Sequence, residues 1–210
     1  MMKTLTKYLL SEFGGGAVTR DEIEAVCRKF GAKYTNTINF MISYGYLVRI
    51  LRGLYYVKTF EEFKLERALD VHRIISLGLN RLGVNWYFGL YTALRLNGLT
   101  HEFPATNFVL NDSIFRPKEI EIAGARTRFL RLKRGLFGFG VVDKNGIRFS
   151  DPEKTILDLA YLSKYRSLPK ERIISTIGEY GEHLERRKLQ AYLKFYPKTI
   201  GEVIRDAGLI

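Results

Sequence analysis

The 210-residue sequence predicts an α+β protein: an N-terminal winged helix-turn-helix, then an α+β domain with a small, mostly antiparallel sheet and a helical C-terminal tail. Three observations predict this fold. Residues 1–60 show three helical patterns followed by a hairpin pattern, residues 107–149 contain short runs of β-branched and aromatic residues, and helical apolar spacing returns after residue 150. We therefore expect a winged-helix unit over 1–60, a linking helix over 61–80 and an α+β domain over 81–210.

The first two helices have clear boundaries in the sequence. A helix from Met2 to Phe13 should end at the three glycines of 14–16, because consecutive glycines are costly inside a helix. Thr19 and Glu22 have the spacing of a capping box, which starts the second helix. Gly31 is suited to end it.

A third helix starting near Thr35 would bury Ile38, Met41 and Ile42 and turn polar side chains outward, as in a helix-turn-helix. The apolar segment 46–57 predicts a hairpin that turns at Arg52-Gly53, and such a hairpin is a wing. The DNA-contacting residues predicted on the third helix and the wing are Lys33, Tyr34, Thr35, Asn36, Thr37, Asn39, Phe40, Ser43, Arg49 and Arg52.

The charge of the chain points to an anionic partner. The formal net charge is +12, and residues 1–60 alone hold nine basic and four acidic residues. Basic side chains close to the helix-turn-helix and the wing would neutralise phosphates. Because the outward residues are Asn, Thr and Arg, we expect double-stranded DNA as the partner and not an interacting protein.

The remaining elements follow from apolar spacing and turn signals. A helix is expected from Trp86 to Leu96, capped by Gly98, and a tail of helices after Ser150. That first tail helix starts either with a Ser150–Glu153 capping box or with Asp151 as the cap before Pro152.

Asp158, within the same predicted helix, is either a surface acid or a buried partner of an arginine. The expected strands are 107–110, 118–122, 127–132, 140–142 and 146–149, and the later tail helices lie near 170–180, 183–195 and 198–208.

The sequence contains few residues that could form a catalytic site. One cysteine and three scattered histidines provide neither a nucleophile beside a base nor a metal site, so we expect no catalytic residues, no metal and no cofactor. One alternative stays open: Asp112, Glu119 and Glu121, with Lys118 and Lys133 as cations, could form the site of a metal-dependent nuclease.

The segment from Arg116 to Arg148 is unusually basic, with nine basic and three acidic residues. It could form a second phosphate-contacting surface that strengthens DNA binding, or simply a solvated face of the sheet. The residues of this possible second basic surface are Arg116, Lys118, Arg126, Arg128, Arg131, Lys133 and Arg134.

Three segments together resemble the AbiEi-type antitoxins of abortive-infection, type IV toxin–antitoxin systems. The hairpin 45–57 contains the Arg-Gly-x-Tyr wing ending, and 91–102 contains Ala-Leu-x-x-x-Gly-Leu-Thr. Segment 149–159 is similar to the family's Pro-Glu-Lys-x-Leu-x-Asp-Leu helix start. The resemblance runs from about Thr4 to Tyr165, and the very basic strand region and the short N-terminal linker depart from the family pattern.

The resemblance implies a transcriptional regulator that binds and represses the promoter of its own two-gene operon through the winged helix. It also implies that the protein opposes a nucleotidyltransferase-class toxin encoded beside it, without a stable complex. A free-standing regulator whose second domain senses a ligand or dimerises is the other open alternative. No membrane segment or signal peptide is evident, so we expect a cytoplasmic protein with no membrane partner.

Overall fold

The computed structural model describes residues 2–65, 67–165 and 168–210. The chain divides into two compact units, one formed by Met1–Val84 with Glu121–Ala125 and the other by Asn85–Ile120 with Arg126–Ile210. Both units combine helices with strands, which confirms the predicted α+β class.

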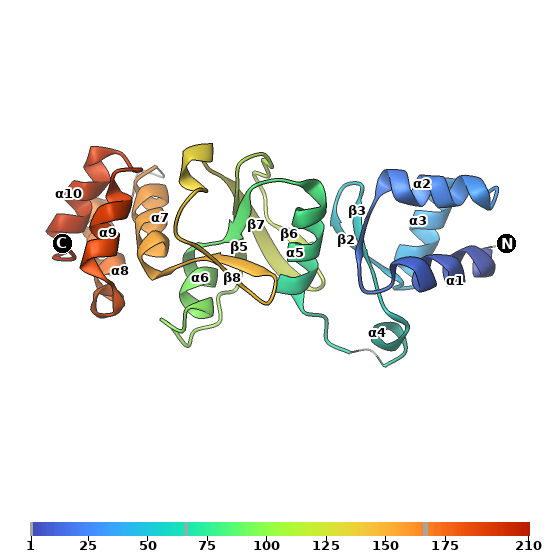
Figure 1. The fold of residues 1–210 in the computed structure, drawn as a ribbon. Coiled ribbons are helices and arrows are strands. Elements are labelled where there is room, and N and C mark those ends of the chain that lie inside the picture. Colours follow the sequence, from blue (N-terminus) through green and yellow to red (C-terminus); the bar gives the residue numbers. More distant parts are fainter. Residues whose placement is uncertain (1, 66, 166–167) are drawn as a thin grey trace. The chain divides into compact units, whose positions relative to one another are not determined.

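The first unit has the element order of a winged helix-turn-helix, as predicted. Three helices lie beside an antiparallel three-stranded sheet of order β1-β3-β2 (Figure 1). The elements are α1 (Met2–Phe13), β1 (Ala17–Thr19), α2 (Arg20–Lys29), α3 (Tyr34–Ser43), β2 (Leu47–Leu51) and β3 (Leu54–Val57).

Local sequence signals explain these boundaries. The backbone N–H of Glu22 donates to the Thr19 hydroxyl, and the N–H of Thr19 donates to the Glu22 carboxylate at 2.8 Å, which completes the predicted capping box. Gly31 follows the end of α2 with a φ of +60°, a conformation that glycine adopts without strain. Leu9, Ile23 and Met41 then meet in the core of the unit.

The expected linking helix over 61–80 is two helices, α4 (Phe60–Lys64) and α5 (Val71–Leu82). The Asp70 carboxylate accepts hydrogen bonds from the backbone N–H groups of His72 and Arg73, so it starts a new helix where a continuous one was expected. Leu65, just after α4, is 59% exposed, and Glu66 lies outside the described residues.

Helix α5 packs on the small sheet of the first unit and is not a free linker. A Cβ added to Gly78 would lie 2.7 Å from Cδ1 of Ile50 and 3.1 Å from Cδ2 of Leu54, so the helix crosses the sheet closely and a larger residue would displace the Ile50 side chain. The helix therefore extends the hydrophobic core of the winged helix, and the first unit continues well past residue 60.

The second unit contains strands that pair in the order β7-β5-β4-β9-β8. Strands were found close to each predicted position in 107–149, and the prediction for Trp86–Leu96 was partly wrong. Trp86–Phe88 is a strand and only Leu90–Leu96 is helical, because three consecutive aromatic residues are buried on both faces of the sheet. The elements are β4 (Trp86–Phe88), α6 (Leu90–Leu96), β5 (Asn107–Asn111), β6 (Ile120–Ile122), β7 (Ala125–Arg131), β8 (Val141–Lys144) and β9 (Ile147–Ser150).

The pairing in this sheet is mixed where a mostly antiparallel sheet was expected. β4–β5 and β8–β9 are antiparallel, while β5–β7 and β4–β9 are parallel. Apolar alternation reports which side chains are buried but not the direction of the neighbouring strand, so the sequence pattern could not distinguish the two.

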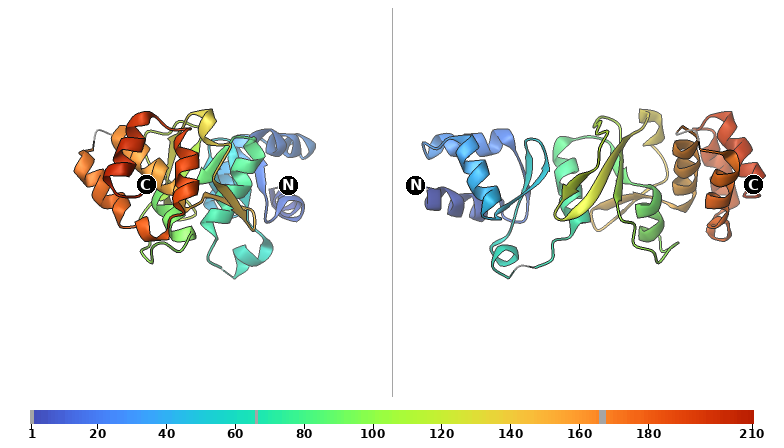
Figure 2. Two further views of the ribbon diagram at one scale, coloured as in Figure 1. Left: turned by 60° about the vertical axis from the view of Figure 1, so that its left-hand side comes forward. Right: turned by 180° about the vertical axis from the view of Figure 1, so that it is seen from behind.

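The helical tail begins with α7 (Pro152–Tyr165) and packs into one apolar core beside the sheet (Figures 1 and 2). Its later helices lie where they were predicted: α8 (Lys170–Gly178), α9 (Arg186–Leu193) and α10 (Lys198–Asp206). Across the described ranges, no helix has the length and apolar character needed to cross a membrane.

Candidate nucleic-acid interface

The outward face of α3 carries the polar side chains predicted to read DNA. Thr35, Asn36, Asn39 and Ser43 are exposed, and Lys33 is exposed at the residue before the helix. In the described part of the chain, the side-chain amides of Asn36 and Asn39 make no hydrogen bond, whereas the Ser43 hydroxyl donates to the carbonyl of Phe40. The two asparagines therefore keep their full hydrogen-bonding capacity for a partner.

Thr37 was predicted to contact DNA, and this is wrong. Its side chain is 0% exposed, because position 37 lies on the same side of the helix as Met41 and Ile38. The Thr37 hydroxyl donates to the carbonyl of Lys33 at 3.1 Å, and the Cys27 thiol donates to the hydroxyl oxygen at 3.5 Å. Thr37 therefore joins α3 to α2 inside the core.

Phe40 lies at the edge of the outward face and packs mainly on other aromatic rings. Its ring centroid is 4.4 Å from that of Tyr44 and 6.4 Å from that of Tyr46. Phe40 also lines an apolar cavity of about 480 Å³ with residues of α1 and α4, including Lys7 and Phe63. Its surroundings thus favour a packing role over the predicted DNA contact.

The hairpin β2–β3 turns at Arg52-Gly53, as predicted, with Leu51 paired to Leu54. Gly53 has a φ of +80°, which explains a glycine at this corner. The side chains of Arg49 and Arg52 are both exposed, so two guanidinium groups project from the wing. Wing arginines in this arrangement can contact phosphates or a narrow minor groove.

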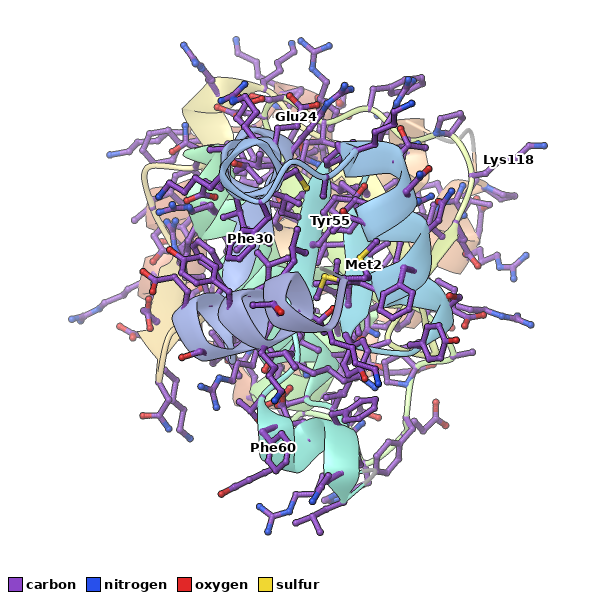
Figure 3. All side chains as sticks on the ribbon, turned by 90° about the vertical axis from the view of Figure 1, so that its right-hand side faces the viewer. Met2, Glu24, Phe30, Tyr55, Phe60 and Lys118 are labelled. Carbon is purple, nitrogen blue, oxygen red and sulfur yellow. The ribbon has the colours of Figure 1, made fainter. Side chains whose placement is uncertain are left out.

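A half-buried tyrosine, Tyr34, and a buried one, Tyr55, link the start of α3 to the wing. The hydroxyl groups of Tyr34 and Tyr55 are 3.1 Å apart, and Tyr55 lies toward the interior of the unit (Figure 3). Burial raises the pKa of Tyr34, so its hydroxyl stays neutral and donates or accepts a hydrogen bond. Tyr34 was predicted as a DNA contact; in the structure its hydroxyl contacts Tyr55 and so holds the start of α3 against β3.

A guanidinium group lies over each of these tyrosine rings. Arg20 is 5.0 Å from the centroid of Tyr34, and Arg49 is 5.9 Å from the centroid of Tyr55. Arg20 is also held by Glu24, with Nε 2.7 Å from Oε1. Sequence reasoning missed Arg20 as a candidate contact, and the signal that could have found it is a basic residue at the first position of α2, next to the predicted wing.

The possible second basic surface is divided by the structure. Five of its residues line one groove of about 950 Å³ in the second unit, while Lys118 and Arg126 are exposed elsewhere on the surface. The five basic residues of this groove are Arg116, Arg128, Arg131, Lys133 and Arg134. Strand phase does not explain the division, because Arg126 and Arg128 have the same phase on β7 although only Arg128 lines the groove.

The three acids of the nuclease alternative do not come together. Glu119 and Glu121 are exposed, whereas Asp112 is buried and accepts hydrogen bonds from Ser113, Asn85 and Arg134. Burial works to raise the pKa of Asp112, but these hydrogen bonds outweigh it and lower the pKa to about 2. Over the described residues, no three His, Cys, Asp or Glu side chains are grouped as metal ligands.

The Pro-Glu-Lys motif at the start of α7 forms a buried polar network. Lys154 and Asp158 are both 0% exposed, with Nζ 3.5 Å from Oδ2. The hydroxyl groups of Tyr87 and Tyr196 donate to the Asp158 carboxylate at 2.8 and 2.7 Å. Asp158 is thus a buried partner, as one alternative held, but of a lysine instead of an arginine.

The cap of α7 belongs to the same network. The backbone N–H of Lys154 donates to Asp151, so Asp151 is the cap and the Ser150–Glu153 alternative is wrong. The second carboxylate oxygen of Asp151 accepts from the Tyr192 hydroxyl at 2.9 Å and lies 3.0 Å from Nζ of Lys188. Helix α9 is therefore tied to the start of α7 by charged hydrogen bonds.

Comparison with known proteins shows the fold alone. No family model matches the chain, and no curated protein matches it. Among solved structures, the Rv2827c protein from Mycobacterium tuberculosis is similar in fold, with a TM-score of 0.60 and 11% sequence identity. The similarity covers 98% of this chain and 76% of the Rv2827c chain.

Proposed function

We propose that this chain is a non-enzymatic transcriptional repressor that binds double-stranded DNA at its own promoter through the winged helix. The observation that carries the proposal is the free polar face of α3, with Asn36 and Asn39 unengaged, beside two exposed arginines on the wing. A helix of this kind fits the major groove, and wing arginines add phosphate or minor-groove contacts.

The wing contribution can be tested by its salt dependence. Replacing Arg49 and Arg52 with Ala should weaken binding to the promoter and to unrelated DNA alike, because phosphate contacts carry no sequence information. Each lost contact should reduce the log–log slope of affinity against salt by about 0.9, hence by about 1.8 for the pair. The measurement is a titration of labelled duplex DNA at several salt concentrations.

The matched control is Arg186→Ala with Arg187→Ala, which removes the same charge from exposed positions on α9. That variant should keep the wild-type slope. A wing variant with the wild-type slope would mean that the wing does not touch DNA.

We also propose that the chain acts as the antitoxin of a type IV system and opposes a nucleotidyltransferase-class toxin without binding it stably. The support is the resemblance of segments 45–57, 91–102 and 149–159 to AbiEi-type antitoxins, in that order along the chain. In the structure, the third segment contributes Ile156 and Leu157 to the core of the second unit, and its Lys154 and Asp158 form a buried pair.

Co-expression tests this second role. When the neighbouring nucleotidyltransferase gene and this chain are expressed from separate foreign promoters, the chain should restore growth that the toxin alone arrests. The variant with Asn36→Ala and Asn39→Ala should restore growth equally, because reading of the promoter is then irrelevant. Growth arrest that persists with wild-type chain present at high level would refute the antitoxin role.

A further inference from the structure

The basic groove of the second unit is a built concave site, not a scatter of surface charges. Five basic side chains line it, together with a single acid, Asp112. It lies where the loop after β5 meets the end of β7, and its volume of about 950 Å³ is at the upper end of the range of ligand-binding pockets.

Most of the positive charge in the groove has no acidic partner. Asp112 is engaged by Asn85 and Ser113, and its one basic neighbour is Arg134, with Nε 3.2 Å from Oδ2. Arg128 has a distant acidic neighbour, with Nη1 3.9 Å from Oε1 of Glu119. In the part of the chain that the structure describes, Arg116, Arg131 and Lys133 form no ion pair. Such a concave cluster of like charges attracts an anion.

An exposed aromatic ring stands beside these charges. Phe115 lines the groove and is 72% exposed, and Tyr161 lines it from α7. A basic groove with an accessible aromatic ring is the arrangement in which phosphates follow the charges and an unpaired base stacks on the ring. Duplex DNA keeps its bases stacked inside the helix, so it could use the charges but not Phe115.

We propose that this groove binds a single-stranded polynucleotide, with phosphates on Arg131 and Lys133 and a base stacked on Phe115. This site is separate from the winged-helix surface, and the proposal does not rest on promoter binding. The proposal assigns a single-stranded ligand to the second unit. It replaces the expectation that the basic segment from Arg116 to Arg148 strengthens binding to duplex DNA.

The test is a fluorescence anisotropy titration of the full chain with labelled RNA and DNA single strands of about 12 nucleotides, and with the matching DNA duplex. Two groove variants are compared with wild type: Arg131→Ser with Lys133→Ser, and Phe115→Ala. The charge variant should weaken single-strand binding by about tenfold or more and reduce the salt slope by about 1.4. Phe115→Ala should weaken it by at least about fivefold and leave the slope unchanged.

The matched control is Lys118→Ser with Arg126→Ser, which removes the same charge from exposed residues outside the groove. It should bind single strands like wild type, and so should Arg49→Ala with Arg52→Ala, which separates this site from the wing. Comparison of the titrations with RNA and with DNA identifies which polymer the groove prefers.

Two outcomes would contradict the proposal. If the charge variant weakened duplex and single-strand binding equally and Phe115→Ala had no effect, the groove would be a duplex-binding surface. The proposal would also be overturned if the groove charge variant and the Lys118→Ser with Arg126→Ser control weakened single-strand binding to the same extent.

Discussion

Replacing Asp158 with Asn should lower the free energy of unfolding of the full chain by about 3–5 kcal/mol, the usual cost of removing one partner of a buried ion pair. The Lys154 ammonium group would lose its carboxylate, 3.5 Å away, at a position with no access to water. The rings of Tyr87, Phe139 and Tyr196 surround that ammonium group and would compensate only in part. Urea denaturation followed by circular dichroism measures the change.

Two comparison variants distinguish a buried charge from a general effect of the substitution. Asp206→Asn makes the same change in the exposed pair of Lys170 and Asp206 and should cost less than about 1 kcal/mol. Adding Lys154→Met to Asp158→Asn removes the unpaired charge, so the double variant should be more stable than Asp158→Asn alone. A double variant that is less stable than the single one would contradict this account of the pair.

The same variant should show a characteristic pH dependence. Burial lowers the pKa of Lys154 below the 10.5 of an exposed lysine, and removal of Asp158 takes away the charge that opposes this shift. In the interval between the lowered pKa and 10.5, the unfolded chain binds more protons than the folded chain. The stability of Asp158→Asn should therefore rise as the pH is raised toward 10.5.

Signals that act over a few residues allowed much of the fold to be predicted. The Thr19–Glu22 capping box, the glycine at 31 and the Arg52-Gly53 turn each specify a backbone conformation locally, so the winged helix could be outlined element by element. The prediction failed at Trp86–Phe88, where burial in the centre of a sheet decides the conformation. Whether neighbouring strands pair in parallel or antiparallel could likewise not be predicted, because the pairing involves residues far apart in the sequence.

The candidate site was predicted less completely, for a related reason. The apolar periodicity correctly placed Asn36 and Asn39 on the outward face of α3. It did not show that the helix starts at Tyr34 or that Thr37 is buried, because a shift of one residue rotates each side chain by about a quarter of a turn. The Tyr34–Tyr55 contact joins residues far apart in sequence, and nothing local indicates it. The groove in the second unit depends on the same kind of distant meeting, between the loop after β5 and the end of β7.

Replacing Asn36 and Asn39 together with Ala should lower the preference for the promoter sequence over unrelated DNA by about 2–6 kcal/mol, if each amide makes one bidentate adenine contact worth about 1–3 kcal/mol. Both residues are exposed, and their amides make no hydrogen bond in the described chain, so the winged helix should fold normally. The measurement is competitive binding of promoter and scrambled duplexes to wild-type and variant protein.

Binding to scrambled DNA serves as the internal control for this variant. It should change little, because the variant keeps the overall charge and the phosphate contacts proposed for Arg49 and Arg52. Thr35→Ala, at an exposed neighbouring position of α3, tests whether any change on this face has the same effect. Its hydroxyl lacks the paired donor and acceptor with which an amide recognises adenine, so a smaller loss of preference is expected. An Asn36 and Asn39 double variant that still prefers the promoter as strongly as wild type would mean that another element reads the sequence, and α3 would no longer be the recognition helix.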